Sequence, residues 1–348
     1  MQHVKVDYII VGQGIAGTWL SRELLKRGKK IIVINHETEN TASLKAAGLY
    51  NPITGRKMVK TWMADELFKS LEKEYKALEN QISAKFLHSI PIYRSFQNIE
   101  SKNDWDGKQS SLSGDSFIKE LKTSSSGLPF INDPLGGIIV DHTGYVDLPV
   151  LIEAFRIFLK NEELYESDLL DHREINFKEN SVSYKGWKAS KIIFCEGSSG
   201  GNPFWEHLPF KLVRGELIDI TCDAELPYIF NQGVFMIPKG DIITVGSTYD
   251  HSVLSYEPQQ KGIDNLKNRL EKVFSAPYEI IAKRAGIRPA THDRKPFIGF
   301  HHERKTLAIF NGFGTKGVSL TPYFAKHFAD VLENKCEIDK EVDVQRVS

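Results

Sequence analysis

The 348-residue sequence contains only three cysteines, Cys195, Cys222 and Cys336, which lie far apart with no CxxC pair. This spacing argues against a disulfide framework or a zinc site, and it is typical of a protein from a reducing compartment. No apolar run approaches the roughly 20 residues of a membrane-spanning helix. The first apolar segment follows the N-terminus too closely for a signal peptide. We therefore expect a cytoplasmic protein without a membrane span.

An excess of charge of one sign is also missing, because 45 lysine and arginine residues balance 45 aspartate and glutamate residues. Nucleic-acid affinity draws heavily on contacts between basic side chains and phosphates. A chain with zero net charge and no basic tract is therefore not expected to bind nucleic acid or an anionic membrane. The apolar fraction of 41% and the charged fraction of 26% are typical of a globular protein.

The most informative feature present is a glycine pattern near the N-terminus. An apolar run over 8–11 leads into Gly-x-Gly-x-x-Gly, a helical pattern over 18–27 and a second apolar run over 31–34. Fully apolar runs are typical of buried parallel strands. The strand–turn–helix–strand order predicts a dinucleotide site with the pyrophosphate at the helix N-terminus. The residues expected at this cofactor are Gly12, Gly14, Ile15, Ala16 and Gly17.

The residue after the second strand departs from the usual dinucleotide pattern. An acidic side chain commonly accepts hydrogen bonds from the ribose there, but this chain has Asn35, followed by His36. An amide can also bind a hydroxyl, although more weakly than a carboxylate. Glu37 is the alternative ribose ligand. We place Asn35 and His36 at the cofactor and leave open whether Asn35 or Glu37 contacts the ribose.

A second glycine loop, over 312–317, precedes the last predicted helix, which covers 318–332. The bare backbone N–H groups of this loop and the positive end of the helix would stabilise negative charge at the N1/C2 edge of a flavin. A nicotinamide enzyme does not need such a loop, so it favours FAD over NAD. Lys316 adds a full charge there or is an exposed loop lysine. The residues expected at the flavin are Gly312, Gly314, Thr315, Lys316 and Gly317.

The middle of the chain predicts a second kind of sheet. Alternating patterns over 216–220, 233–237 and 241–245 indicate antiparallel strands that cover a pocket. Apolar residues at helical spacing predict helices over 62–80, 117–121 and 261–274. The predicted fold class is α/β, with a Rossmann-like FAD-binding domain interleaved with an α+β substrate domain on a mostly antiparallel sheet. We assign 1–82, 142–212 and 283–348 to the FAD-binding domain, and 83–141 and 213–282 to the substrate domain.

Arg288 is the strongest candidate for substrate binding. It lies between a strand-like segment and Pro289, opposite the antiparallel strands, where a guanidinium would bind a carboxylate through two parallel hydrogen bonds. The alternative is a structural ion pair with Asp293 or Glu303. His301 and His302 form a loop pair with no third ligand at metal spacing, so no metal is expected.

These motifs together carry a family resemblance. The order of the Gly12–Gly17 turn, the 43–48 loop, the 213–216 segment, the 286–289 segment and the Gly312–Gly317 loop resembles the D-amino-acid oxidase superfamily of FAD-dependent oxidoreductases, especially its glycine oxidase and sarcosine oxidase branch. The resemblance implies oxidation of a carbon–nitrogen bond by hydride transfer to flavin N5, with Arg288 binding the substrate carboxylate. It further implies flavin contacts from Ser43, Ala46, Ala47, Gly48 and Gly197.

Two departures from that branch concern the site. Phe235 stands where a roof-strand tyrosine is common, and a phenyl ring can pack on a substrate but cannot donate a hydrogen bond. Tyr249 follows the roof strand and is the candidate replacement. No cysteine near Arg288 corresponds to the one that binds flavin covalently in sarcosine oxidases, so FAD is expected to be non-covalent.

The expected function is therefore FAD-dependent oxidation of an amino acid or a related amine that carries a carboxylate, with oxygen or a quinone as the electron acceptor. Two alternatives stay open. The 46–52 segment also resembles the flavin domain of the bacterial tRNA wobble-uridine modifying enzyme. The third possibility is a flavin-binding protein without turnover of its own.

Overall fold

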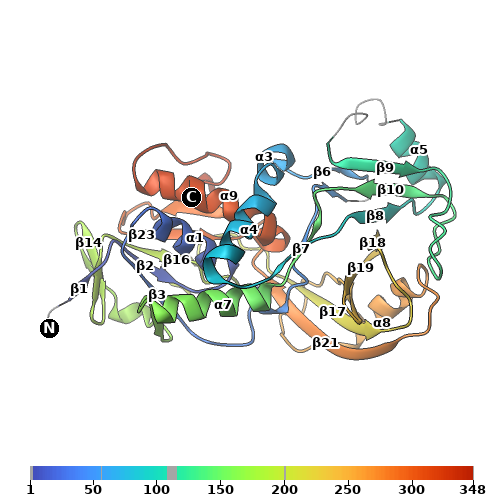
Figure 1. Ribbon diagram of the computed structural model, residues 1–348. Helices are drawn as coiled ribbons and strands as arrows, with labels where there is room; N and C mark the ends of the chain where they lie inside the picture. Colours follow the sequence, from blue (N-terminus) through green and yellow to red (C-terminus); the bar gives the residue numbers. More distant parts are fainter. Residues whose placement is uncertain (1–2, 56, 108–115, 200, 348) are drawn as a thin grey trace.

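The computed structural model describes residues 3–55, 57–107, 116–199 and 201–347. Two large sheets lie side by side, with a mainly parallel sheet on the left of Figure 1 and a mainly antiparallel sheet on the right. The predicted α/β class with two kinds of sheet is confirmed. None of the helices within these ranges is long and apolar enough to cross a membrane.

The parallel sheet has six strands in the order β12-β3-β2-β16-β23-β22. The first five run parallel to one another, and only the edge strand β22 is antiparallel. The central strands are apolar at nearly every position, because both faces of the sheet are covered. The bounds are β2 (Tyr8–Val11), β3 (Ile31–Asn35), β12 (Tyr165–Ser167), β16 (Lys191–Phe194), β22 (Phe297–Phe300) and β23 (Leu307–Asn311).

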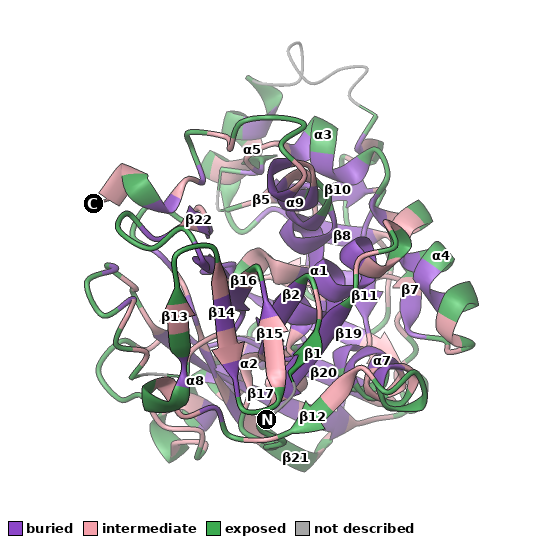
Figure 2. Cartoon of the chain, turned by 90° about the vertical axis from the view of Figure 1, so that its left-hand side faces the viewer, coloured by how far each residue is buried: buried purple, intermediate pink, exposed green. Residues whose placement is uncertain are grey.

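Alternate residues of these strands supply two separate hydrophobic cores. Ile10 and Val33 pack with the helices α1 (Ile15–Lys26) and α9 (Gly317–Leu332). Ile9 and Ile32 point to the opposite face and pack under the small sheet β1-β15-β14-β13. Figure 2 shows the buried residues concentrated in α1, α9 and the strands between these layers. The parallel sheet is thereby held rigidly from both sides.

The antiparallel sheet has eight strands in the order β21-β17-β20-β19-β18-β8-β10-β9. Only the β18–β8 pair is parallel, and helix α8 (Gln260–Leu270) packs on the face of β17, β19 and β20. The bounds are β8 (Ile92–Ser95), β9 (Ile118–Lys122), β10 (Gly137–Val140), β17 (Val213–Thr221), β18 (Ile229–Gln232), β19 (Val234–Lys239), β20 (Ile242–Gly246) and β21 (Glu279–Arg288).

The other elements are shorter or join the two sheets. Helix α7 (Leu148–Asn161) begins at Asp147, whose side chain accepts from the N–H of Val150. The remaining helices are α2 (Ala42–Lys45), α3 (Ala64–Phe68), α4 (Leu71–Ile82) and α5 (Ile99–Asp106). The remaining strands are β1 (Val4–Lys5), β4 (Leu49–Tyr50), β5 (Ile53–Thr54), β6 (Val59–Lys60), β7 (Leu87–Ser89), β11 (Gly144–Val146), β13 (Asn176–Lys178), β14 (Ser181–Tyr184) and β15 (Trp187–Ala189).

The structure corrects three details of the sequence analysis. The helix predicted over 117–121 is wrong, because these residues form strand β9 against β10. The helix predicted over 62–80 is divided into α3 and α4. Strand β21 crosses the boundary proposed between 282 and 283, since it stays paired with β17 up to Arg288. The division of the chain into five domain segments otherwise stays a prediction.

An ionic cluster holds α1 against α9. Arg27 at the end of α1 lies 2.9 Å from Glu23, 2.6 Å from Asp330 and 2.9 Å from Glu333. Lys29 also contacts Glu333, at 2.9 Å. The hydrogen bonds from Lys335, Lys29 and Arg27 lower the pKa of Glu333 to about 2. Because α1 and α9 both begin at the site described below, this cluster helps to fix their relative position.

Glu333→Gln is expected to cause a small loss of stability at neutral pH, because ion pairs near the protein surface contribute little. The lowered pKa means that the ionised carboxylate stabilises the fold fully above its ordinary pKa of 4.5, and that this contribution is lost as the pH falls toward 2. Urea denaturation midpoints of the two proteins should therefore converge as the pH falls from about 5 to about 2. Glu162→Gln, at an exposed glutamate, is the control. A difference that is independent of pH would contradict this explanation.

Candidate active site

A cavity of about 1630 Å³ lies between the carboxyl ends of the parallel strands and the antiparallel sheet. Pockets for a single drug-sized ligand have volumes of roughly 300–1,000 Å³. This cavity therefore has room for a dinucleotide together with a second, smaller ligand. Of the twenty site residues predicted from the sequence, only Gly17 does not line it.

The turn after β2 brings the backbone close to the cavity. Gly12 has φ +95°, a conformation that favours glycine, and a Cβ there would lie 2.7 Å from the carbonyl oxygen of Cys195. A Cβ on Gly17 would lie only 1.9 Å from the carbonyl oxygen of Gly12. Gly17 thus serves the close packing of α1 on the turn, as the glycine pattern predicts.

The N-terminus of α1 opens into this cavity. Its N-cap residue, Gly14, provides no side-chain cap, and its first turn carries no acidic residue. Of the first N–H groups, that of Ile15 donates to Ser43 Oγ at 3.0 Å. Bare N–H groups and the positive end of the helix dipole suit a pyrophosphate. The residues present here therefore fit the diphosphate of a dinucleotide.

The structure separates the two candidates for the ribose contact. Asn35 and His36 line the cavity, and Asn35 Oδ1 accepts from the N–H of Gln13 at 2.8 Å while its Nδ2 donates to the Tyr165 hydroxyl at 3.0 Å. Glu37 is not among the described residues that line the cavity. Its hydrogen bond with Lys160 on α7 lowers its pKa. Asn35 is therefore the better placed of the two.

The second glycine loop lies at another part of the same cavity. Gly312, Gly314, Thr315, Lys316 and Gly317 all line it, together with Ser43, Ala46, Ala47, Gly48 and Gly197. Helix α9 begins at Gly317 without a side-chain cap. Its half-buried neighbour Lys316 contacts the Thr61 hydroxyl, and burial lowers the pKa of this lysine. Two uncapped helix N-termini thus face one cavity, which suits the diphosphate of FAD and the N1/C2 edge of its flavin, where negative charge develops on reduction.

Arg288 lies on the antiparallel side of the cavity, at the end of β21. Its guanidinium lies over Gly215 of β17, where a Cβ would be 2.2 Å from a guanidinium nitrogen. Nη1 donates to the carbonyl oxygen of Thr248 at 3.3 Å, and the guanidinium carbon is 4.8 Å from the ring centre of Tyr249. Burial lowers the pKa of Arg288. Phe235 of β19 also lines this side of the cavity.

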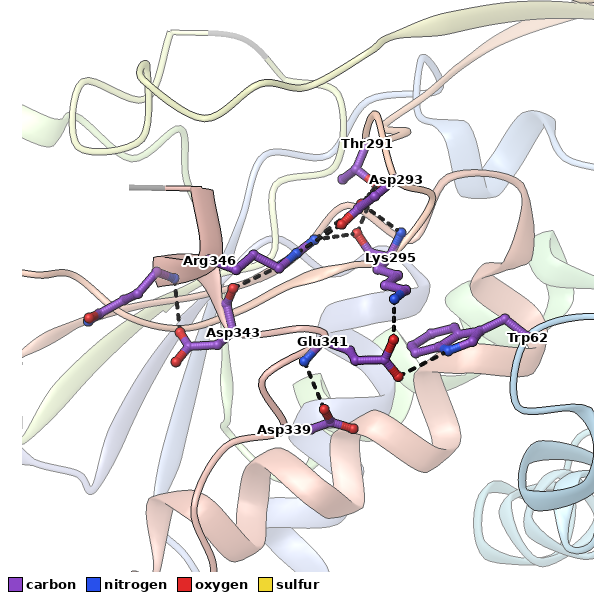
Figure 3. A network of polar contacts seen from close by, with 9 residues as sticks. Trp62, Thr291, Asp293, Lys295, Asp339, Glu341, Asp343 and Arg346 are labelled. Atoms are coloured by element: carbon purple, nitrogen blue, oxygen red, sulfur yellow. Dashed lines mark hydrogen bonds and ion pairs between the residues drawn. The ribbon is translucent and has the colours of Figure 1, made fainter.

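The structural ion pair considered for Arg288 is not formed. Asp293 binds Arg346 near the C-terminus, with Nε donating to Oδ2 at 3.0 Å, within the polar network of Figure 3. Glu303 lies 3.8 Å from His302 instead. Arg288 has no carboxylate within ion-pair distance among the described residues. Its guanidinium therefore keeps most of its donors for a ligand.

The loop at His301 and His302 also differs from the expectation. A carboxylate oxygen of Glu303 and one ring nitrogen each from His301 and His302 all lie within 4.8 Å of one another. The prediction that no third ligand lies nearby is therefore wrong. His301 Nδ1 already accepts from the backbone N–H groups of Glu303 and Arg304, at 3.2 and 3.3 Å.

Residues that sequence analysis missed also bear on the site. Tyr165 orients Asn35 and Thr61 contacts Lys316 from behind the cavity lining, and Arg269 of α8 lines the cavity itself. All three are brought to the site by packing between distant segments. No local pattern in the sequence distinguishes them from ordinary surface or core residues.

Glycine turns, two helix N-termini and an antiparallel roof define a dinucleotide-binding oxidoreductase with a substrate cavity beside the cofactor. The family model for FAD dependent oxidoreductases (DAO) matches residues 7–331, so the chain belongs to this family. FAD is accordingly its cofactor. The predictions of the family, of FAD and of an oxidoreductase enzyme are thereby confirmed.

Individual relatives cover nearly the whole chain. Glycine oxidase of Geobacillus kaustophilus (strain HTA426) is 28% identical over 365 residues, which cover 95% of this chain and 94% of the relative. The tRNA 5-methylaminomethyl-2-thiouridine biosynthesis bifunctional protein MnmC of Legionella pneumophila (strain Philadelphia 1) is 24% identical over 98% of this chain, which spans only 56% of that relative's length. The crystal structure of glycine oxidase from Geobacillus kaustophilus has a TM-score of 0.78 at 20% identity and covers 97% of each chain.

Gly17→Ala is expected to force α1 away from the Gly12 turn, because the added methyl group overlaps the Gly12 carbonyl. Overpacking of this kind costs about 1–3 kcal/mol, and the displaced N–H groups should bind FAD less well. Urea denaturation and the flavin-to-protein absorbance ratio measure the two effects. Gly186→Ala is the matched control, since no atom lies within 4 Å of a Cβ there. Wild-type stability and FAD content in Gly17→Ala would contradict the packing argument.

Proposed function

We propose that this protein oxidises the carbon–nitrogen bond of an amino acid, or of a related amine that carries a carboxylate. The observation that carries the proposal is the guanidinium of Arg288, which lines the cofactor cavity without a carboxylate partner among the described residues. Burying an unpaired charge is costly, and a planar guanidinium binds a carboxylate through two parallel hydrogen bonds. A substrate carboxylate therefore completes this site.

Gly12, Gly14 and the Gly312–Gly317 loop would hold FAD, which would supply a hydride acceptor for the substrate carbon. Loss of the hydride would leave an imine, which water would hydrolyse. Arg288 would hold the carboxylate and so orient that carbon. The Phe235 ring would pack against the substrate and exclude water from one side. Lys316 and the N-terminus of α9 would provide positive potential for the flavin. Oxygen or a quinone would then take the electrons from the reduced flavin.

We also propose that FAD is held non-covalently. Of the three cysteines, only Cys195 lines the cavity. Its Cβ lies beside Gly17, 3.5 Å from the position of an added Cβ, at the dinucleotide turn rather than beside Arg288. Burial raises the pKa of Cys195, which disfavours the reactive thiolate. The cytoplasmic location stays a prediction.

The names of the relatives support an amine substrate in two ways. Glycine oxidases favour a small amino acid, while the bifunctional tRNA protein favours an aminomethyl-uridine side chain. One observation supports this second candidate. Among the described residues that line the cavity, eight are lysine or arginine and two are aspartate or glutamate, in a chain of zero net charge. A tRNA mobility shift that weakens with salt would favour the tRNA reaction.

Anaerobic titration with glycine, sarcosine, proline and D-amino acids is expected to bleach the flavin absorbance with at least one of them. Arg288→Met should raise the apparent Kd for that substrate about tenfold to a hundredfold, because a charge-assisted bond is lost. Arg284→Met is the control, since Arg284 lies on the same strand but pairs with Asp219 outside the cavity. Flavin that no amine bleaches, or an Arg288→Met protein with unchanged Kd, would contradict the proposal.

A further inference from the structure

A second arginine, Arg269, lines the same cavity with no function assigned to it so far. It projects from α8, the helix that packs behind the antiparallel sheet, and reaches the end of the sheet. One Nη2 hydrogen bond goes to the carbonyl oxygen of Gly233, in the turn between β18 and β19. Nη1 donates to the carbonyl oxygen of Ser247 at 3.2 Å and to Asn265 Oδ1 at 3.3 Å. These three acceptors fix the position of the guanidinium, but all of them are neutral.

Arg269 and Arg288 lie around the same short segment of chain. The carbonyl oxygens of two successive residues hold them, Ser247 for Arg269 and Thr248 for Arg288. The ring of the next residue, Tyr249, lies against Arg288, with its centre 4.8 Å from the guanidinium carbon. Two cationic groups that both line the cavity are therefore held by two successive residues of one short segment.

Neither guanidinium has a carboxylate within ion-pair distance in the described part of the chain. Three other arginines in buried or partly buried positions do: Arg27 binds Asp330, Arg214 binds Glu216, and Arg284 binds Asp219. The buried Arg94 donates to the carbonyl oxygens of Ile53 and Gly55 instead. Burial lowers the pKa of Arg269, as it does for Arg288. The cofactor's diphosphate is expected at α1, beside the parallel sheet, and so does not account for either charge.

We propose that the substrate carries a second anionic group, which Arg269 binds while Arg288 binds the carboxylate next to the reacting carbon–nitrogen bond. This inference rests on the proposed amine oxidation. The substrate class that fits is a small amine with two carboxylates, such as an N-carboxymethyl amino acid or an acidic amino acid. Tyr249, whose ring lies against Arg288, also lines this cavity.

A matched pair of substrates tests this assignment. Iminodiacetate is sarcosine with a carboxylate added to its N-methyl group. In anaerobic flavin reduction, wild-type enzyme should show a lower apparent Kd for iminodiacetate than for sarcosine. Arg269→Met should raise the Kd for iminodiacetate about tenfold to a hundredfold and leave that for sarcosine within about twofold. Arg288→Met should weaken both. Arg269→Lys should restore part of the loss, because it keeps the charge.

The control is Lys267→Met, which removes a positive charge from the same helix at a side chain that lines a separate hollow. FAD content and the melting temperature establish that each variant is folded. If Arg269→Met raised the apparent Kd equally for iminodiacetate and sarcosine, the inference would be overturned. Arg269 would then only hold the backbone at Ser247 and Gly233 in position. Equal Kd values for both substrates in wild-type enzyme would also overturn it.

A binding measurement without turnover separates this inference from the proposed function. Succinate should perturb the flavin spectrum and raise the melting temperature more than propionate does, and Arg269→Met should abolish the difference. If no amine reduces the flavin but this difference is seen, the oxidation proposal fails and the second anionic subsite stands. If succinate binds no better than propionate while tRNA binding depends on Arg269, the inference of a small dicarboxylate is overturned in favour of nucleic-acid phosphates.

Discussion

The site depends on the position of two strands within the parallel sheet. Strands β2 and β23 are separated only by β16, and each continues through glycines into a helix. Because parallel strands end at the same edge of a sheet, the N-termini of α1 and α9 meet at one cavity. The Arg27 cluster and the core between α1 and α9 hold this arrangement in place. Both helix ends can then act on one bound dinucleotide.

Positive charge in this molecule is concentrated at the cavity rather than spread evenly. The chain has zero net charge, and many of its arginines are neutralised by carboxylates, as Arg346 is by Asp293 in Figure 3. The cavity instead collects cations that have few acidic neighbours. The neutral total led to the expectation that no anionic macromolecule would bind. A summed charge cannot show this local excess, because it averages the paired surface with the unpaired site.

Local patterns in the sequence predicted the parts of the fold that depend on neighbours along the chain. The Gly12 turn, the apolar strands and the start of α9 after the second glycine loop are of this kind. The segment 117–121 was mistaken for a helix, because it is too short for its pattern to separate the two structures and its pairing with β10 decides the outcome. Arg269 could not be identified, since its role comes from contacts with Gly233 and Ser247.

The two faces of β17 show how the roof can hold an unpaired arginine. Arg214 and Glu216 point away from the cavity and form a buried pair at 2.9 Å, beneath α8. Gly215 lies between them and faces the cavity, where its missing side chain leaves the space that the Arg288 guanidinium occupies.

Thr248 connects the two faces. Its hydroxyl donates to Glu216, and its carbonyl oxygen accepts from Arg288. Glu216 is thus committed to Arg214 and Thr248 and lies on the far side of the strand from Arg288. Its negative charge favours the protonated form of Arg288 without occupying the donors of that guanidinium. A carboxylate on the cavity face would occupy them, and the site would then lose its affinity for an anionic substrate.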